Sequence, residues 1–444
     1  MVVIIFSCMI FFVTPLSISE KISTEYESMD KSNLNDILDG SWMEDKGDFK
    51  ILFLNGTNYN MGYQYGYYLK TGIEENMRCV NFWCDYFGWT YNKRIDIWNI
   101  QKEYIPQCYH HEIQGMADGS GISFEEIAVY NIWFDLLNLP HCWGAALWGS
   151  ATVDGNLYHM RSADGTYSAT DPQTGKYFHE NTALIIRNPK VGYASIDPEF
   201  IGDIFVHGGF NEKGIGVSEL TIRSFDSQIL GLSGGFRMRM VLDFASDITE
   251  AVEILNSNRT CGINFILSDA NIPAGYAIEQ SANLVYTGAW CDPVEATDPF
   301  WQIRDFVRRG NMCIHPLIAE CQRKNYDPSG LNGLIKYLLK KNMAYVPWSQ
   351  YRAISKEIAN QHGTLDLNST MTLFRDVYTG KTDLIFGIMQ RLNYYRSGHQ
   401  WVACPKTGDL KISFGTHTKN ACDNNVYDFN LFDLLNYNPN NLKS

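Results

Sequence analysis

A pair of strand-like runs on either side of the dipeptide Asp154-Gly155 most constrains how this chain folds. Asp-Gly favours the tight turns that link antiparallel strands, because glycine adopts a positive φ without strain. The segment therefore predicts a hairpin whose first strand begins at Cys142 and whose second strand ends near Arg161. Such a hairpin returns Arg161 and Asp164 to the neighbourhood of the cysteine sulfur, so a thiol, a guanidinium and a carboxylate would converge.

The segments on either side of this hairpin differ in their patterns. Before it the chain is mainly helical, and Ser123 and Glu126 have the spacing of a capping box. After it, β-branched and aromatic runs alternate with Gly, Asn and Asp, which is typical of strands. The strand-like runs cover residues 49–54, 182–186, 192–196, 214–219, 262–267 and 275–279, and the helical patterns cover 62–80, 99–116, 124–137, 235–244, 248–255 and 330–341. No repeat or linker divides the chain, so we expect one α+β body with stacked sheets.

The amino terminus resembles a targeting segment. Residues 2–15 are almost wholly apolar, and Ser17 and Ser19 supply small residues before the first charged side chains. This pattern is typical of a secretory signal peptide, here residues 1–19, whereas the lack of a basic residue before the apolar run leaves an uncleaved membrane anchor open. The prediction is a secreted or lysosomal protein with no bilayer span left after signal removal.

Three Asn-x-Ser/Thr triplets fit passage through the secretory pathway. They are centred on Asn55, Asn258 and Asn368. Each is a candidate glycosylation site, although such triplets also arise by chance.

Composition excludes one class of partner. The chain has 444 residues, of which 45% are hydrophobic, so it can bury a sizeable core. Its formal net charge is −13 and it contains no basic run, whereas nucleic acid is bound mainly through clusters of Lys and Arg. We expect no nucleic-acid partner.

The cysteine pattern argues against both a metal site and full disulfide pairing. Of the eleven cysteines, Cys8 lies in the presumed signal, and a free thiol at Cys142 leaves nine, so at least one more stays unpaired. Cys79 and Cys84 are too far apart for a Cys-x-x-Cys motif, and no histidine flanks a cysteine pair at ligand spacing. We expect no metal and no cofactor.

The order and spacing of Cys142, Arg161 and Asp164 resemble those of the N-terminal nucleophile hydrolases. The resemblance is to the branch that contains the fungal penicillin acyltransferase, with acid ceramidase and bile-salt hydrolases as more distant relatives. Four further segments are similar to this family, at residues 55–66, 113–119, 209–217 and 307–312. Together they extend the resemblance over residues 40–415, nearly the whole mature chain.

The resemblance implies a fold and a maturation step. The expected fold is an αββα four-layer sandwich with two stacked, mainly antiparallel sheets. Self-cleavage of the His141–Cys142 bond would turn the protein from a zymogen into two chains that stay associated. Residues 20–141 would form a helical leader segment, released or retained, and residues 142–444 the catalytic segment, which forms one compact body with residues 47–141.

The resemblance also implies the chemistry of the site. Once the bond is cut, Cys142 carries both a thiol nucleophile and an α-amine whose reference pKa of about 7.7 to 8.0 suits it to take the thiol proton. Asp164 would hydrogen-bond or orient the Cys142 ammonium, and Arg161 would keep Asp164 ionised and lower the thiol pKa. The product of attack on an amide is an acyl thioester, which then meets water or an amine.

Three further residues are assigned less directly. Attack on a carbonyl generates an oxyanion that needs hydrogen-bond donors. Asn311 is the candidate side-chain donor, and a backbone N–H near Asn211 is the candidate second donor. Trp143 stands where relatives carry Ser or Thr, which makes it a candidate for shaping the substrate pocket.

Each of these residues also has a plain structural explanation. Cys142 would pack as a small buried side chain or form half of a disulfide, and Arg161 with Asp164 would be a surface ion pair. Asn211 would be a turn residue and Asn311 a cap or loop amide. The convergence of all of them in one family pattern favours the catalytic interpretation.

Three functional classes therefore compete. The first is a thiol amidohydrolase that cuts a linear amide of an N-acylated lipid or small amine. The second is an acyltransferase that passes the acyl group from the same thioester to an amine. The third is a non-enzymatic secreted lipid-binding glycoprotein that keeps the fold with a blocked cysteine.

Overall fold

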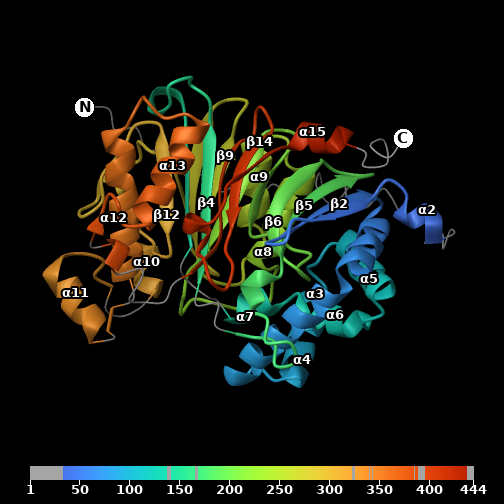
Figure 1. The fold of residues 1–444 in the computed structure, drawn as a ribbon. Coiled ribbons are helices and arrows are strands. Elements are labelled where there is room, and N and C mark those ends of the chain that lie inside the picture. The colour runs from blue at the N-terminus through green and yellow to red at the C-terminus, as the bar shows by residue number, and fades with distance from the viewer. Residues whose placement is uncertain are drawn as a thin grey trace, which may run out of the picture.

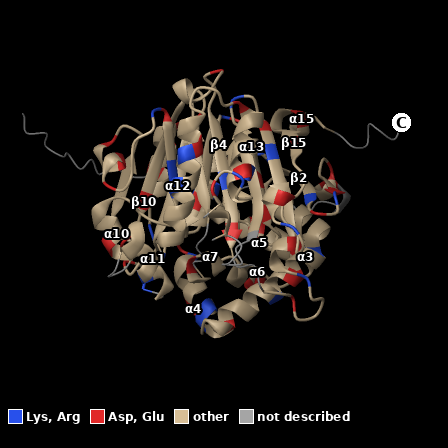
Figure 2. Cartoon of the chain, turned by 60° about the vertical axis from the view of Figure 1, so that its left-hand side comes forward, with Lys and Arg blue, Asp and Glu red and all other residues tan. Residues whose placement is uncertain are grey.

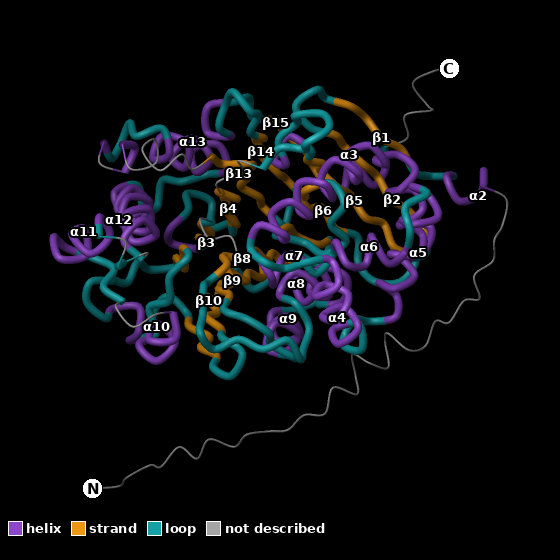
Figure 3. Tube along the Cα trace, turned by 90° about the horizontal axis from the view of Figure 1, so that it is seen from below, coloured by secondary structure: helices purple, strands orange, loops and turns teal. Residues whose placement is uncertain are grey.

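The computed structural model describes residues 34–137, 142–165, 169–322, 326–339, 341–342, 344–384, 386–388 and 396–437. In these ranges two β-sheets lie face to face, and helices cover the outer face of each sheet (Figure 1). The same succession of helices, sheets and helices is seen from below in Figure 3. This arrangement confirms the predicted α+β, four-layer αββα fold. The expected signal peptide and His141 lie outside the described residues.

The larger sheet has the strand order β1-β2-β5-β6-β7-β8-β9-β10-β11. Its strands are β1 Trp42–Asp45, β2 Lys50–Gly56, β5 Thr182–Pro189, β6 Ser195–Phe200, β7 Gly208–Asn211, β8 Ile215–Thr221, β9 Ile263–Asp269, β10 Ala274–Gln280 and β11 Val285–Gly288. Every neighbouring pair is antiparallel except β2 and β5, which run parallel. The strands predicted within residues 49–54 and 182–279 are all present, with ends shifted by a few residues.

The smaller sheet contains the predicted hairpin. Its order is β12-β3-β4-β13-β14-β15, with β12 Phe306–Gly310, β3 Trp143–Leu147, β4 Tyr158–Gly165, β13 Arg396–Cys404, β14 Asp409–Phe414 and β15 Tyr427–Asn430. β3 and β4 are antiparallel, and Trp143 lies opposite Ser162. Gly155 in the connection has a φ of +74°, which only glycine adopts readily. The hairpin predicted from Asp154-Gly155 is therefore confirmed.

The amino-terminal half supplies most of the helices on the larger sheet. They are α2 Leu34–Leu38, α3 Asn58–Tyr86, α4 Tyr91–Gln101, α5 Gln107–Ser120, α6 Phe124–Tyr130 and α7 Trp133–Leu137, followed later in the chain by α8 Gly234–Phe244 and α9 Ile248–Asn256. α3 and α5 pack so closely that a Cβ at Gly62 would lie 2.0 Å from the carbonyl oxygen of Glu112. Glycine at this position is therefore required for the contact between the two helices.

Two of the predicted helices are each divided in the structure, and one predicted helix start is confirmed. The helix predicted over residues 124–137 becomes α6, which ends at Tyr130, and α7, which begins at Trp133. The single helix predicted over residues 99–116 is divided, since α4 ends at Gln101 and α5 begins after Pro106. Proline disfavours helical φ and ψ at the residue before it, which explains the break. The predicted capping box is present, because Ser123 and Glu126 exchange both hydrogen bonds at the start of α6.

Helices from the carboxyl-terminal half cover the smaller sheet. They are α10 Pro316–Gln322, α11 Gly330–Leu338, α12 Tyr345–Asn360 and α13 Leu367–Tyr378, and α15 Leu431–Asn436 follows the last strand. Four short 3₁₀ turns are η1 Gly149–Ala151, η2 Phe178–Glu180, η3 Pro293–Ala296 and η4 Ala421–Asp423. α12 and α13 contact β12 and β13, so a second core lies between these helices and the smaller sheet.

A buried histidine links the two sheets. His159 of β4 hydrogen-bonds Ser218 of β8 at 2.9 Å and Ser268 of β9 at 2.8 Å. Burial lowers the pKa of His159 to about 3, so its ring is neutral. A Cβ at Gly216 would lie 2.9 Å from His159 Nδ1, so glycine at that position lets the strands approach. These contacts fix which residues of β3 and β4 face the larger sheet.

The charged side chains are dispersed over the surface. Figure 2 shows Lys and Arg scattered among Asp and Glu on both the helices and the strands. Among the described helices, none combines the length and the apolar character needed to cross a bilayer.

Candidate active site

Cys142 and Arg161 lie on the same face of the hairpin. Arg161 pairs with Gly144, two residues after Cys142, and alternate residues of a strand point to the same side. Cys142 is 5% exposed, and Arg161 Nη2 lies 3.6 Å from its sulfur. The structure therefore brings together the thiol and the guanidinium, as predicted, in the layer between the two sheets.

Glu219 is the acid that completes this cluster, and the sequence reasoning missed it. It lies in β8 of the facing sheet and accepts a hydrogen bond of 2.5 Å from Arg161 Nη2. The Cys142 thiol lies 3.9 Å from the same carboxylate oxygen. The available signal was a glutamate within a strand that is otherwise apolar or small, at residues 215–220. A charge in such a strand is buried, and a buried charge needs a partner.

The environment keeps the Cys142 thiol protonated in the uncut chain. Burial raises its pKa, Glu219 raises it further and Arg161 lowers it, and the result is a pKa of about 12. The Asp164 main-chain N–H also donates to the sulfur. A thiol in this state is a poor nucleophile until a base takes its proton.

Asp164 lies on the opposite face of β4, which corrects one expectation. Its carboxylate accepts hydrogen bonds from Ser162 Oγ at 2.5 Å, Tyr378 Oη at 2.6 Å and Gln350 Nε2 at 3.1 Å. These partners lie on the side of the sheet covered by α12 and α13. Arg161 therefore pairs with Glu219 rather than with Asp164, and Asp164 reaches the sulfur through its main chain.

Burial also sets the protonation of Asp164. The carboxyl group is buried, which raises its pKa, and the three hydrogen bonds only partly offset this effect. The pKa of Asp164 is about 7. A cation nearby would stabilise the carboxylate, and an α-ammonium group at Cys142 would be such a cation.

Asn311 lies beside the site but is not shown at the sulfur. Its Nδ2 donates to the carbonyl oxygen of Thr221 at 2.7 Å, and Thr221 lines the same pocket as Cys142. Asn311 Nδ2 carries a second hydrogen, which can be donated to another acceptor. Its role as an oxyanion donor remains a prediction.

Asn211 and Trp143 are placed away from the pocket that contains Cys142. Asn211 Nδ2 donates to the carbonyls of Leu242 and Ala245, and its Oδ1 accepts from the main chain of residues 213 and 215, so the amide fixes a turn. Trp143 is fully buried, with its ring centroid 5.4 Å from that of Phe374. Since side chains alternate along β3, Trp143 faces α13, and the structure supports neither residue as part of the substrate site.

The remaining predicted sites have mixed placements. Asn258 and Asn368 are exposed, whereas Asn55 is half-buried in β2 and its Oδ1 accepts a hydrogen bond from Asn188. The ten cysteines that the structure describes all carry free thiols, including Cys142. Cys142 is therefore not held in a disulfide.

A small pocket lies over the sulfur. Its wall includes the aromatic rings of Trp133, Phe134, Phe178 and Phe200, and its polar lining includes Arg161, His207 and Glu219. The cavity has a volume of about 30 Å³, which is room for a single water molecule. Trp133 and Phe134 belong to α7, just before the expected cleavage site.

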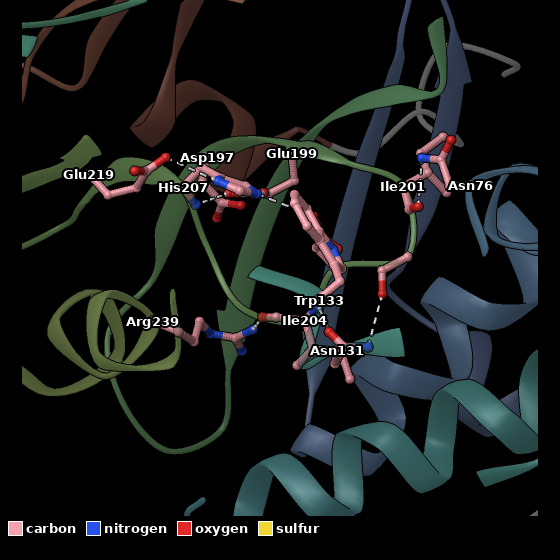
Figure 4. A network of polar contacts seen from close by, with 12 residues as sticks. Asn76, Asn131, Trp133, Asp197, Glu199, Ile201, Ile204, His207, Glu219 and Arg239 are labelled. Atoms are coloured by element: carbon pink, nitrogen blue, oxygen red, sulfur yellow. Dashed lines mark hydrogen bonds and ion pairs between the residues drawn. The ribbon is translucent and has the colours of Figure 1, made fainter. Parts of the chain in front are cut away.

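An acidic cluster that contains a histidine lies next to this pocket. One oxygen each of Glu199 and Asp203 and one ring nitrogen of His207 all lie within 4.8 Å of one another. Figure 4 shows His207 between Glu219 and Glu199. The signal for this cluster in the sequence is a pair of carboxylates four and eight residues before a histidine.

Removing the charge of Glu219 is expected to destabilise the fold. The change Glu219→Gln leaves the buried Arg161 guanidinium without its carboxylate, and such losses cost about 3 to 5 kcal/mol. Urea denaturation at neutral pH measures the change in the free energy of unfolding. Glu212→Gln, at a partly exposed acid 3.6 Å from Lys213, is the control and should cost under about 1 kcal/mol. Equal effects in the two variants would show that Glu219 does not balance Arg161.

Residues 154–291 match a family model described as acyl-coenzyme A:6-aminopenicillanic acid acyl-transferase. The matched segment contains Arg161, Asp164 and Glu219, and it begins after Cys142. It confirms the resemblance predicted from the sequence. Over these residues, which make up less than a third of the chain, the protein is similar to the penicillin acyltransferases.

Three curated relatives align with much of the chain. Protein dcd1A of Dictyostelium discoideum is 26% identical over 71% of this chain and 66% of its own length. Protein dcd1B of the same organism is 24% identical over 54% of this chain and 52% of its own length. An uncharacterized protein of Archaeoglobus fulgidus is 21% identical over 49% of this chain and 41% of its own length. The chain thus spans less than two thirds of each relative.

Two types of solved structure are similar in part. A mutant form of the conjugated bile acid hydrolase from Clostridium perfringens aligns with 67% of this chain and 97% of its own, with 16% identity and a TM-score of 0.37. The N-acylethanolamine-hydrolyzing acid amidase ortholog of Caenorhabditis elegans aligns with 60% of this chain and 93% of its own, with 16% identity and a TM-score of 0.35.

Proposed function

We propose that this protein is an N-terminal nucleophile cysteine amidohydrolase that cleaves the linear amide bond of an N-acylated lipid or small amine. The observation that carries the proposal is the contact of Arg161 with both the free Cys142 thiol and Glu219, beside an aromatic pocket. A structural cysteine needs no such charged partners, because free cysteine packs as a small apolar side chain.

The first step of the proposal is self-cleavage of the His141–Cys142 bond. The Cys142 sulfur attacks the carbonyl carbon of His141, the C–N bond breaks, and Cys142 gains a free amine while its sulfur holds a thioester. Water then hydrolyses the thioester and releases the carboxyl group of His141. Glu219 is the carboxylate within reach of the thiol proton, 3.9 Å away.

The second step is turnover at the new amino terminus. The α-amine takes the thiol proton, the thiolate attacks the substrate amide, and the leaving amine departs with a proton. Arg161 stabilises the thiolate, and Asn311 is the candidate donor to the oxyanion. Water then resolves the acyl thioester and restores the free thiol. Apart from water, residues of the protein supply the groups that these steps use.

The pocket supports an apolar acyl group. Phe178 and Phe200 come from the body of the protein, and Trp133 and Phe134 from the segment before the cleavage site. Their rings offer apolar area to an acyl chain. This arrangement favours an N-acylated lipid or another apolar acyl donor over a polar peptide.

An acyltransferase that uses the same thioester is the second candidate. The match to a family described as an acyl-transferase favours it. The two reactions differ only in whether water or an amine attacks the thioester, so the site residues and their roles are the same.

The proposed setting is the secretory pathway, either outside the cell or in the lysosome. The apolar stretch at residues 2–15 and the exposed triplets at Asn258 and Asn368 support it. Treatment of the secreted protein with an N-glycosidase should lower its mass at these two asparagines.

The test is a panel of N-acyl amides incubated with the mature protein, with mass detection of the acid and the amine released from each. We expect at least one N-acyl lipid amide to give both products in equal amounts. Adding a primary amine should leave the acid yield unchanged for a hydrolase and convert acid to new amide for an acyltransferase. Binding of N-acyl lipids without release of either product would instead favour a non-enzymatic lipid-binding protein.

A further inference from the structure

We propose that Glu199, Asp203 and His207 bind one divalent transition-metal cation of the Zn²⁺ class next to the candidate active site. All three side chains are buried, and their facing atoms are Glu199 Oε2, Asp203 Oδ2 and His207 Nε2. The proposal concerns a site separate from the Cys142 chemistry and does not depend on it.

The distances between these atoms fit a shared cation. His207 Nε2 lies 3.3 Å from Asp203 Oδ2 and 3.8 Å from Glu199 Oε2. Zinc binds histidine nitrogen and carboxylate oxygen at about 2.0 to 2.2 Å in a tetrahedral arrangement. Two ligands at that bond length and angle are separated by roughly 3.3 to 3.6 Å. The cluster therefore needs only small shifts to surround one ion.

A buried oxygen without a hydrogen-bond donor points into this space. Glu199 Oε1 accepts from the main-chain N–H of His207 at 2.5 Å, which leaves Oε2. Glu199 is 0% exposed, and its Oε2 accepts no hydrogen bond from the described residues. An unsatisfied buried carboxylate oxygen is costly, and a cation would satisfy it.

The charge of the surrounding layer also calls for a cation. The cluster and its neighbours hold three buried carboxylates, Glu199, Asp203 and Glu219, against the single permanent cation Arg161. One divalent cation with a neutral His207 balances the three carboxylates and Arg161.

The other ring nitrogen of His207 has the partner that a metal-bound histidine requires. His207 Nδ1 lies 3.3 Å from Glu219 Oε1. A ligating histidine almost always donates its second N–H to a carboxylate or carbonyl, which fixes the tautomer and the ring. Glu219 is also the carboxylate that holds Arg161 beside Cys142, so the proposed ion and the thiol share one positioning residue.

Aromatic rings surround His207. The rings of Trp133, Phe134, Phe200 and Phe205 have centroids between 5.3 and 5.7 Å from that of His207. Trp133 Nε1 also donates to Asp203 Oδ1 at 2.8 Å, so the oxygen of Asp203 that faces His207 Nε2 is Oδ2. An apolar shell strengthens the electrostatic attraction between the ion and its ligands.

The test uses the full secreted protein with Zn²⁺ or Co²⁺ as the probe. After dialysis against a chelator, we expect the wild type to rebind about one Zn²⁺ per chain by elemental mass spectrometry. Saturating Zn²⁺ should raise the Tm by about 5 °C, because a ligand that binds only the folded state stabilises it. With Co²⁺, visible d–d bands should appear without thiolate charge-transfer bands, which separates this site from the free cysteines.

Matched variants decide the result. Glu199→Gln keeps the shape of the side chain and its hydrogen bond from His207, and it should lose the bound metal and the Tm shift. Glu180→Gln changes a partly buried acid outside the cluster and should keep both. If Glu199→Gln does not fold, Asp203→Asn takes its place and should likewise lose the bound metal and the Tm shift. No Zn²⁺ retained by the wild type, or equal retention in Glu199→Gln and Asp203→Asn, would overturn the proposal.

Discussion

Cys142→Ala is expected to remain a single uncut chain and to lose amide cleavage by at least about 10³-fold, because the proposed nucleophile and the proposed base belong to one residue. Without the sulfur, no thioester forms with His141, so the α-amine is never released. Denaturing electrophoresis of the purified variant measures the first effect, and the N-acyl amide assay measures the second. The fold should persist, because the loss of one sulfur atom at the edge of the inter-sheet core leaves only a small cavity.

Two further cysteine variants sharpen this result. Cys142→Ser keeps a hydroxyl nucleophile of similar size and should be cut slowly. If residue 142 is the nucleophile, the rate of self-cleavage should fall from the wild type to Cys142→Ser and be zero in Cys142→Ala. Cys291→Ala removes an exposed free thiol and should be processed and active like the wild type. Normal processing of Cys142→Ala would contradict the self-cleavage mechanism and favour an external protease.

Asp164→Asn is expected to stabilise the uncut protein and yet to abolish most activity after maturation. A buried acid whose pKa is raised from 3.8 to about 7 is bound to its proton more tightly in the folded state than in the unfolded state. Ionisation of Asp164 therefore lowers the free energy of unfolding as the pH rises from about 4 to about 7. The full cost at and above pH 7 is at most about 4 kcal/mol, and the neutral amide avoids it.

The measurement is urea denaturation between pH 4 and pH 8 in the Cys142→Ala background, which keeps the chain uncut. The difference in stability between Asp164→Asn and its parent should be small near pH 4 and should grow up to pH 7. Asp154→Asn on the same hairpin is the control with the opposite sign, because hydrogen bonds lower the pKa of Asp154 despite the effect of burial. A flat pH profile for Asp164→Asn would show that Asp164 is not held as a neutral buried acid.

Loss of activity in Asp164→Asn tests a different property of the same residue. In the mature protein the new α-ammonium of Cys142 would lie one residue along the hairpin register from Asp164 and would favour its ionised form. The neutral side-chain amide of Asp164→Asn cannot balance the charge of the Cys142 α-ammonium. A mature Asp164→Asn protein with near-normal turnover would remove Asp164 from the site, whatever its effect on stability.

Local sequence signals predicted the hairpin and most of the strands. Asp154-Gly155 selects a turn, and runs of β-branched and aromatic residues select strands, so both follow from neighbouring residues alone. The division of the helix at Pro106 was also readable from the sequence, since proline penalises the helical conformation of the residue before it. The prediction of one helix over residues 99–116 did not include this effect of Pro106.

The partner of Arg161 could not be read in the same way. Alternation along β4 places Arg161 and Asp164 on opposite faces, because the two residues are three positions apart. The carboxylate that faces Arg161 comes from β8 in the other sheet, 58 residues away in the chain. Its identity depends on how the two sheets stack, which His159 and its two serine partners determine.

The cluster at His207 depends on the fold for a similar reason. Glu199 is in β6, and Asp203 and His207 lie in the segment that joins β6 to β7. Only the path of that segment brings the three side chains to one point beside Glu219. Spacing alone, four and eight residues before a histidine, would have suggested a helical face instead.

The measurement that tests the central claim most directly is peptide mass spectrometry of the active, mature protein after its free amines have been chemically labelled. We predict a labelled peptide that begins at Cys142, together with a second chain that ends at His141. An active preparation in which the His141–Cys142 bond is intact, with no labelled amine at Cys142, would contradict the mechanism proposed for this site.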